Sequence, residues 1–594
     1  MNKLPVKIFD DFLNWRLKNI SERHFLFILS IVVGIVAAFA AIILKTAVHN
    51  IEYFVRNLTE GSILNWLYLG LPFTGILITV IYIRYVIKDD ISHGVTKILQ
   101  SISKSKGYIK LHNIYSSIVG CAFTTGFGGS VGMEAPIVYT GSAIGSNISR
   151  VCKLNFRRRT LLLGCGAAAA IAAIFKAPIA GLIFALEVLM LDLTLSSIVP
   201  LLIATVTAAL VSSIFLGEKV EFYFSIKEAF SFGDIPLFIL LGILCGFVSL
   251  YFTHVNYYIE NLFRKLEKPF KKVIIGGLAL SVLIFLFPPL FGEGYITLRA
   301  LLTDNPMSLL DNSLFYSLGH IEWVFVLFLV LVLLFKVVAT SVTTGSGGVG
   351  GVFAPSLFMG ALTGFIFARL FNISRIVSLS ETNFALVGMA GLIAGVIHAP
   401  LTAIFLIAEI TGGYELFIPL IITASLSYIT IIYFEPHSLY TKKLAQKGEL
   451  ITHHKDQAVL TLLKIENVVE KNLLTVQEEA SLGDLVKIIA RSKRNIFPVI
   501  NEKNEFLGLV PLDEVREIMF QKEMYDKVFV KDLMVQPPEK VSLNDSMDCV
   551  MDKFKKTGLW NLPVIEKGVY IGFVSRSNVF NAYRKLLIEF SDEA

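Results

Sequence analysis

The stretch that decides the fold occurs twice in the chain. Thr124–Gly145 reads TTGFGGSVGMEAPIVYTGSAIG, and Thr343–Gly364 reads TTGSGGVGGVFAPSLFMGALTG. The two align without gaps at an offset of 219 residues (343 − 124), and ten of the 22 positions are identical. A second pair follows in the same order: FKAPIAGLIFALEV at Phe175–Val188 and IHAPLTAIFLIAEI at Ile397–Ile410. Two matched pairs in one order indicate that the chain contains a duplication.

The composition around these repeats is that of a membrane protein. Of the 594 residues, 54% are hydrophobic and 17% are charged, and the mean hydropathy is +0.67. A soluble domain carries about 25% charged residues. Runs such as Phe25–Leu44 reach the roughly 20 apolar residues that a membrane span needs. Other runs are short or interrupted by Gly and Pro, which predicts a compact bundle with broken and half-crossing helices.

Duplicated halves in a membrane protein are typical of transporters and channels, whose sites form where the repeats meet. We expect a polytopic α-helical domain with inverted halves, which requires an odd number of spans in each half. Short basic segments beside the apolar runs, Arg16–Arg23, Arg157–Arg159 and Lys442–Lys447, indicate a cytosolic side and not a nucleic-acid interface. The five cysteines are scattered at spacings that suit neither a metal site nor a disulfide framework.

In both copies of the first repeat, a Gly-rich segment precedes Ala-Pro and an apolar helical run. Pro marks the first turn of a helix, where its missing N–H costs nothing. The free N–H groups and the positive dipole end at such a start bind an anion without a full positive charge, and weak binding suits conduction. The alternative is that the glycines only allow close helix packing.

The two copies differ at one position that carries chemistry. Glu134 in the first copy corresponds to Phe353 in the second. An acid within a membrane region is costly and is a candidate for function. At a helix start its carboxylate can occupy the place of an anion, and protonation would release it, which predicts a pH-dependent gate. The alternative is a helix cap that faces solvent.

These elements resemble two motifs of the CLC chloride channels and transporters. Residues 132–136, GMEAP, resemble the G-x-E-x-P element of that family, and residues 351–355, GVFAP, resemble its G-x-F-x-P element. The resemblance implies a homodimer in which each subunit has its own chloride pathway. It also implies that Glu134 is the outer gate.

The resemblance further implies which groups hold the central anion. These are the backbone N–H groups of Val352 and Phe353, together with the hydroxyl of Tyr440, which otherwise is an ordinary interfacial tyrosine. The family's third element, G-S-G-I-P, has only a weak counterpart at residues 92–96, SHGVT. Gly94 is identical, but His93 replaces the anion-coordinating serine. An imidazole N–H can donate to an anion, so His93 leaves chloride and nitrate both open, unless it merely caps a helix.

A second departure bears on the mechanism. Proton-coupled members of the family have an inner glutamate that passes protons toward the gate, and the corresponding residue here is Val188. An aliphatic side chain cannot relay a proton, which favours a passive channel over a chloride/proton antiporter. The preceding Glu187 has a repeat mate in Glu409, and this pairing predicts a structural role for both.

Residues 468–594 alternate like a soluble α/β domain, with FPVI at 497–500 and LPVI at 562–565. They resemble a tandem CBS pair, with units at about 468–525 and 530–586. Such pairs bind adenine nucleotides (ATP, ADP or AMP), and Asp513 takes the position of the ribose-binding acid. Asn578 replaces that acid in the second unit, and a purely structural dimerisation module is the alternative.

The domain organisation that we expect follows the chain in four parts. These are a cytosolic N-terminal segment (1–24), the transport domain (25–440), a linker (441–467) and a cytoplasmic CBS module (468–594). We expect a multi-pass protein of the inner (plasma) membrane that needs no cofactor and binds no nucleic acid. No HExxH, G-x-S-x-G or phosphate-loop motif points to an enzyme. A CBS-bearing cation transporter, the remaining class, would need several carboxylates within its spans.

Overall fold

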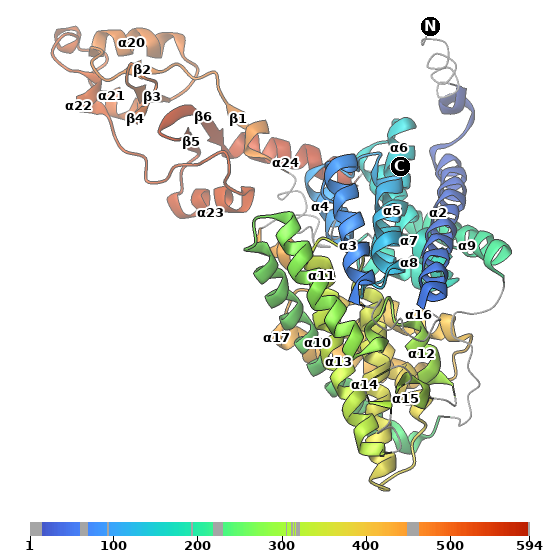
Figure 1. The fold of residues 1–594 in the computed structure, drawn as a ribbon. Helices are drawn as coiled ribbons and strands as arrows, with labels where there is room; N and C mark the ends of the chain where they lie inside the picture. The colour runs from blue at the N-terminus through green and yellow to red at the C-terminus, as the bar shows by residue number, and fades with distance from the viewer. Residues whose placement is uncertain are drawn as a thin grey trace. The chain divides into compact units, whose positions relative to one another are not determined.

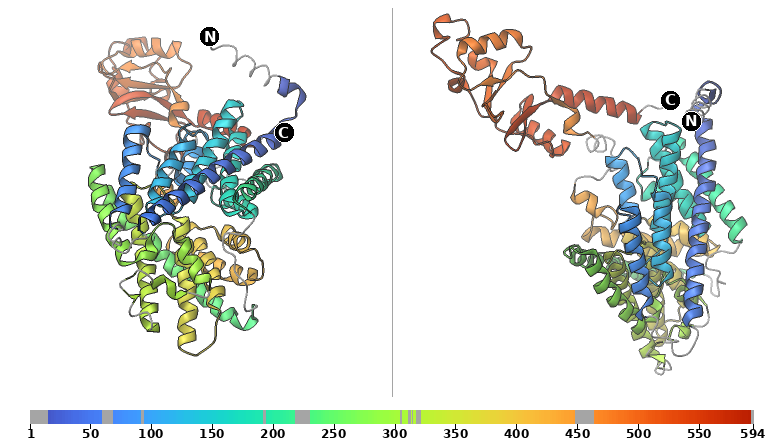
Figure 2. Two further views of the ribbon diagram at one scale, coloured as in Figure 1. Left: turned by 45° about the vertical axis from the view of Figure 1, so that its right-hand side comes forward. Right: turned by 45° about the horizontal axis from the view of Figure 1, so that its top comes forward.

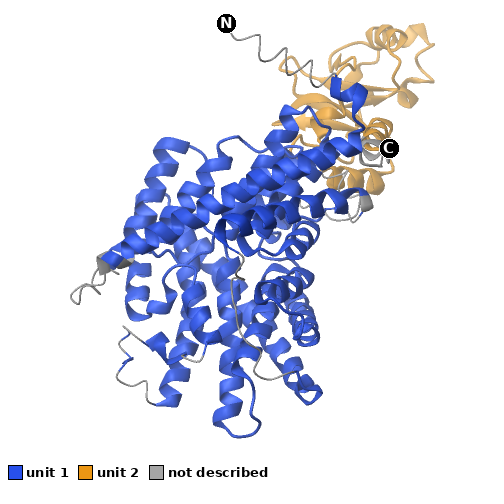
Figure 3. Ribbon diagram, turned by 90° about the vertical axis from the view of Figure 1, so that its right-hand side faces the viewer, with its two compact units in different colours: residues 1–447 blue, residues 448–594 orange. Residues whose placement is uncertain are grey.

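The computed structural model describes residues 15–59, 69–91, 94–191, 194–217, 230–303, 306–310, 313, 315–316, 321–447 and 463–591. The chain forms two compact units, Met1–Lys447 and Gly448–Ala594, and each is described by itself (Figure 3). The division falls within the segment 441–467 that the sequence suggests as a linker.

Unit 1 is a bundle of helices (Figure 1). Its first half contains α2 (Glu22–Thr59), α3 (Leu71–Ile81) with a π-helical turn (Tyr82–Ile87), α4 (Gly94–Lys104), α5 (Asn113–Gly126), α6 (Glu134–Val151), α7 (Phe156–Phe175), α8 (Pro178–Glu187) and α9 (Leu195–Leu216). Its second half contains α10 (Ile235–Arg264), α11 (Pro269–Leu286), α12 (Tyr295–Leu302), α13 (Glu322–Gly345), α14 (Phe353–Ile373), α15 (Glu381–Ile397), α16 (Pro400–Thr411) and α17 (Phe417–Phe434), followed by α18 (Lys442–Gln446). The helices of each half lie together, and the two halves lie side by side (Figure 2).

The helices repeat in the order that the sequence predicts. Helices α6 and α14 begin at repeat mates, Glu134 and Phe353, and each has proline as its third residue. Helices α8 and α16 begin at the matched prolines, Pro178 and Pro400. Within the described part of the chain, eight helices are long and apolar enough to cross a membrane, whereas α8 and α16 are shorter. The predicted mixture of spanning and broken helices is therefore confirmed.

Glycines on α6 and α14 allow the closest helix contacts of each half. A Cβ on Gly141 of α6 would lie 2.1 Å from the carbonyl oxygen of Gly166 on α7. A Cβ on Gly360, the repeat mate in α14, would lie 2.4 Å from the carbonyl oxygen of Gly388 on α15. Small residues let membrane helices approach to backbone contact. Gly141 and Gly360, which follow the Gly-rich segments, therefore serve helix packing.

Unit 2 is an α/β module with two three-stranded sheets. Its elements are β1 (Val469–Glu470), β2 (Val476–Gln477), α20 (Leu482–Arg491), β3 (Ile496–Ile500), β4 (Phe506–Pro511), α21 (Leu512–Val515), α22 (Val530–Leu533), α23 (Met547–Thr557), β5 (Asn561–Glu566), β6 (Val569–Ser575) and α24 (Arg576–Ser591). One sheet has the order β2-β3-β4, and the other has the order β1-β6-β5. Strand β1 thus joins the sheet of the second repeat, with Val469 opposite Val574, and ties the two repeats together.

Candidate anion pathway and gate

The two Gly-rich loops meet directly before α6 and α14. The N–H of Gly132 donates to the carbonyl oxygen of Gly351 at 2.9 Å, and the N–H of Gly351 donates to the carbonyl oxygen of Gly132 at 2.8 Å. The two residues are repeat mates (132 + 219 = 351) and form an antiparallel bridge. A Cβ on Gly351 would lie 2.8 Å from the Cβ of Ala135, so the bridge needs glycine. The positive ends of α6 and α14 therefore converge at one junction.

Two threonines hold the junction in the same reciprocal way. The N–H of Val349 donates to Oγ1 of Thr124 at 3.0 Å, and the N–H of Ser130 donates to Oγ1 of Thr343 at 3.3 Å. Thr124 and Thr343 are repeat mates, and so are Ser130 and Val349. Contacts that recur with the halves exchanged are those of a two-fold relation, as inverted repeats have.

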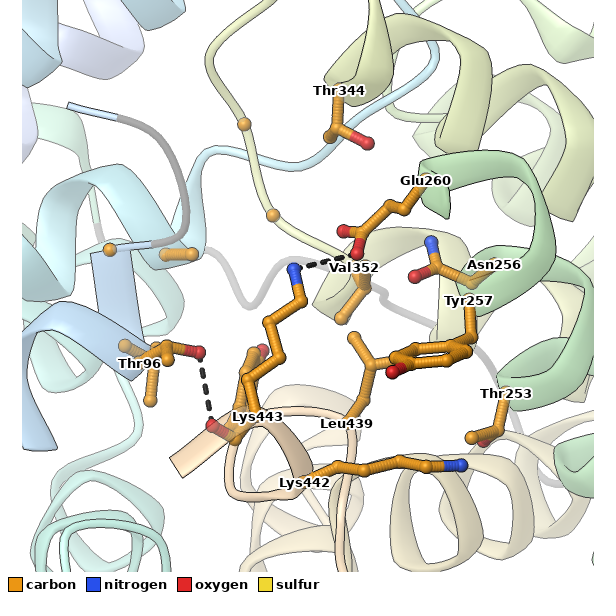
Figure 4. Close-up of a pocket in the computed structure, with 16 residues that line it drawn as sticks. Thr96, Thr253, Asn256, Tyr257, Glu260, Thr344, Val352, Leu439, Lys442 and Lys443 are labelled. Atoms are coloured by element: carbon orange, nitrogen blue, oxygen red, sulfur yellow. Dashed lines mark hydrogen bonds and ion pairs between the residues drawn. The ribbon is translucent and has the colours of Figure 1, made fainter. Parts of the chain in front are cut away.

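A cavity lies beside this junction, with about 40 Å³ of space for the centre of a water molecule. One water needs about 10–15 Å³ of such space, so the cavity has room for a few water molecules. Three predicted anion-binding residues line it together: Gly94, Val352 and Tyr440. Oγ1 of Thr96 donates to the carbonyl oxygen of Tyr440 at 3.0 Å, which joins α4 to the end of the helical unit (Figure 4).

The other two predicted anion-binding residues are Phe353 and His93. Phe353 is 1% exposed at the start of α14, and its ring centroid lies 5.7 Å from that of Phe175. His93 lies outside the described residues.

Two lysines line the cavity, and both are paired with acids. Lys442 Nζ lies 2.8 Å from Oε1 of Glu435. Lys443 Nζ lies 2.6 Å from Oε2 of Glu260 (Figure 4). A paired lysine holds an anion less strongly than an unpaired one, because its charge is largely compensated. An anion placed among the first N–H groups of α14 and these compensated cations would be held weakly, as suits an ion that must also leave.

Glu134 is the first residue of α6 and is 2% exposed. This burial contradicts the alternative of a solvent-facing cap. The hydroxyl of Tyr295, at the start of α12, donates to Oε1 of Glu134 at 2.6 Å. Tyr295 could not be predicted from the sequence, because nothing in the repeat marks it.

Two further ionisable residues near Glu134 were also not predicted from the sequence. Glu293 is 6% exposed, and its Oε1 accepts from the N–H of Met133, the residue before Glu134, at 2.9 Å. Lys336 of α13 is fully buried, and its Nζ donates to the carbonyl oxygen of Gly292 at 3.1 Å. Their signal in the sequence is an ionisable side chain between or within apolar helices, which marks a candidate for function by default.

Glu187 and Glu409 exchange caps between the halves. The carboxylate of Glu187 accepts from the N–H groups of Leu401 and Thr402 at 3.2 and 2.8 Å and from Oγ1 of Thr402 at 2.7 Å. The carboxylate of Glu409 accepts from the N–H groups of Ile179 and Ala180 at 3.0 and 2.8 Å. Each acid therefore caps the short helix of the other half, α16 or α8, which is the structural role that their repeat relation predicts.

Val188 follows Glu187 directly at the end of α8. Its side chain is 5% exposed, and its N–H donates to the carbonyl oxygen of Phe184 at 2.9 Å.

The two predicted nucleotide contacts lie near the starts of corresponding helices of unit 2 but one position apart, since Asp513 is the second residue of α21 and Asn578 is the third residue of α24. Asp513 lies in α21, directly after β4, and Asn578 lies in α24, directly after β6. The Asp513 side chain is 77% exposed and pairs with Arg516 at 2.6 Å. The N–H of Asn578 donates to Oγ of Ser575 at 3.2 Å.

Comparison with known proteins agrees with this geometry. The family model described as voltage gated chloride channel matches residues 74–431, and the CBS domain model matches residues 465–521 and 530–585. The chain belongs to the CLC family. It is therefore a multi-pass membrane protein that acts as a chloride channel or as a chloride/proton antiporter, and it is not an enzyme.

Two relatives are equally similar to the chain and carry different names. It is 28% identical over 439 residues to the voltage-gated ClC-type chloride channel ClcB of Escherichia coli, covering 70% of this chain and 98% of that protein. It is also 28% identical over 439 residues to the H(+)/Cl(-) exchange transporter ClcA of Vibrio cholerae, covering 71% of this chain and 88% of that protein. The crystal structure of a eukaryotic CLC transporter shares the fold, with a TM-score of 0.59, 19% identity, and coverage of 94% of this chain and 99% of that one.

Proposed function

We propose that this protein is a passive chloride channel whose gate is Glu134. The observation that carries the proposal is the chemistry at the end of α8. Val188 has no proton to give, and the adjacent acid, Glu187, is held by three hydrogen bonds from Leu401 and Thr402. Neither side chain is suited to pass protons toward Glu134, so chloride would move without obligatory proton exchange.

The anion site is proposed at the start of α14, beside the cavity. The N–H groups of Val352 and Phe353 and the hydroxyl of Tyr440 would donate to chloride, and Gly94 would leave room for it. His93 would add a further donor.

The gate would work by competition at the converging helix ends. Ionised Glu134 at the start of α6 takes the place of an outer anion, held by the hydrogen bond from Tyr295. A proton removes its charge, weakens this attachment and lets the side chain leave, so that external acid opens the pathway.

The organisation around this pathway belongs to the same proposal. Residues 1–24 and the linker 441–467 would flank the transport domain 25–440, with the CBS module 468–594 in the cytoplasm. The protein would reside in the plasma membrane as a homodimer with one pathway per subunit. An adenine nucleotide bound near Asp513 and Asn578 would regulate it.

A proton-coupled chloride exchanger is the second candidate. It is supported by the 28% identity to the Vibrio cholerae exchange transporter, which is as high as the identity to the Escherichia coli channel. An exchanger would drive protons against their gradient when chloride runs down its own, whereas a channel would not.

The gate is tested by chloride efflux from liposomes that contain the purified protein, as a function of external pH. Wild-type efflux is expected to rise as the external pH falls, and Glu134→Gln is expected to give efflux that no longer depends on external pH. Glu381→Gln is the matched control, because Glu381 pairs with Arg369 at 3.1 Å, away from the junction. Efflux in Glu134→Gln that stays as pH-sensitive as in the wild type would remove Glu134 from the gate.

A further inference from the structure

A short turn before α12 reaches the start of α6. Gly292 and Gly294 have φ values of +61° and +92°, in the left-handed region that favours glycine. A Cβ on Gly294 would lie 2.4 Å from the ring of Phe358 on α14. These two glycines therefore allow a tight turn that carries Glu293 and Tyr295 against the gate.

Glu293 and Tyr295 bind adjacent residues at the start of α6. Glu293 accepts the N–H of Met133, and Tyr295 donates to the carboxylate of Glu134. The N–H groups at a helix start are the donors that would otherwise bind an external anion. Glu293 is thus a second carboxylate bound at the N-terminal start of α6, next to Glu134.

A buried lysine of α13 contacts the same turn. Lys336 donates to the carbonyl oxygen of Gly292, and its Nζ lies 4.7 Å from the ring centroid of Phe358. Other ionisable groups lie within electrostatic reach of Glu293 or Glu134: Lys45 and Glu52 of α2, Cys121 of α5, Lys336 of α13 and Tyr440. Glu134 and Glu293 themselves repel each other when both are ionised.

Two carboxylates in one buried site do not ionise independently. Each negative charge makes it easier for the neighbouring acid to hold a proton, and the opposite charge of Lys336 acts in the other direction. Such a pair takes up protons in steps that belong to both residues together. The proton occupancy of Glu134 therefore depends on the charge of Glu293.

We propose that Glu293 is a positioning and proton-binding residue of the gate, and that its charge sets the external pH at which Glu134 leaves the pathway. The inference rests on the proposed role of Glu134. Glu293 acts through Glu134 and not by contact with chloride, and it keeps the α6 start occupied by its bond to Met133.

The test compares the external pH midpoint of chloride efflux in wild type and in Glu293→Gln. The amide oxygen of glutamine still accepts from Met133, so this change removes the charge and keeps the cap. Without the negative charge, Glu134 needs more acid to become protonated, and the midpoint is expected to fall by about one pH unit. Lys336→Gln removes the opposing charge and is expected to raise the midpoint by a similar amount.

Opposite shifts for these two changes would support the proposal, because a merely structural cap predicts no shift of either sign. An unchanged midpoint in Glu293→Gln would overturn it, provided that Glu134→Gln abolishes the pH dependence. If Glu134→Gln stays pH-sensitive, the proposed gate itself fails. Where Glu293→Gln gives no monodisperse protein, Lys336→Gln decides alone: a rise of the midpoint supports the proposal, and no rise overturns it.

Discussion

Replacing Tyr295 with Phe is expected to loosen the gate without removing any charge. The change deletes the hydroxyl that donates to Oε1 of Glu134 at 2.6 Å and leaves the ring in place. A hydrogen bond to a charged group contributes about 1.5–3 kcal/mol. Because this bond stabilises the ionised, seated form of Glu134, its loss makes protonation and release easier.

The size of the expected pH shift follows from this range of hydrogen-bond free energies. One pH unit corresponds to about 1.36 kcal/mol, so the midpoint of chloride efflux is expected to rise by about 1–2 pH units. At a fixed pH well above the midpoint, the open population should increase by about ten- to one-hundred-fold, since each 1.36 kcal/mol is a factor of ten.

The assay is chloride efflux from liposomes over a series of external pH values. Tyr251→Phe is the matched control, because the Tyr251 hydroxyl donates to the backbone carbonyl oxygen of Leu334 at 2.9 Å and not to the carboxylate of Glu134. An unchanged midpoint in Tyr295→Phe, with normal pH dependence in the wild type, would refute the hydrogen bond as part of the gate.

Three further predictions concern the anion site and the junction. Tyr440→Ala is expected to weaken chloride binding by about tenfold, through loss of one donor worth roughly 1.5 kcal/mol, and calorimetry with unchanged affinity would exclude its hydroxyl from the site. Glu187→Gln removes one of the two carboxylate oxygens that cap α16 and is expected to destabilise the protein by about 1–3 kcal/mol. The measurement is the midpoint of heat-induced aggregation, which should fall, while the folded fraction should retain chloride flux. Gly351→Ala places a Cβ about 2.8 Å from Ala135 and is expected to reduce both stability and chloride flux, whereas wild-type behaviour would show that the bridge can move apart.

Much of the fold could be predicted because the duplication carries it in the sequence. The matched Gly-rich loops and prolines located the starts of α6 and α14 at Glu134 and Phe353. The matched acids, Glu187 and Glu409, predicted a structural role, and the structure shows them as reciprocal caps. The residues that start a helix and the internal repeat can both be recognised from the sequence alone.

The surroundings of the gate could not be predicted in this way. Tyr295 and Glu293 lie about 160 residues after their partners and outside the matched segments. The repeat mate of Lys336 is Ser117 (336 − 219), so no second copy marks the lysine. These contacts depend on a tight glycine turn and on tertiary packing, which a pattern of residue types does not encode.

The same limit applies to unit 2. The repeated strand motifs predicted two α/β repeats, but β1 has only two residues and pairs with β6, about 100 residues later. So short a strand has no periodic signal of its own.

The central claim, passive chloride movement past Glu134, is tested most directly by recording chloride and proton fluxes together. Purified protein in liposomes is given a chloride gradient, with potassium and valinomycin to set the membrane potential. A passive channel should give chloride efflux with no uphill movement of protons, in keeping with Val188 at the end of α8. Protons driven against their gradient would contradict it and would make the protein a chloride/proton exchanger with another proton route.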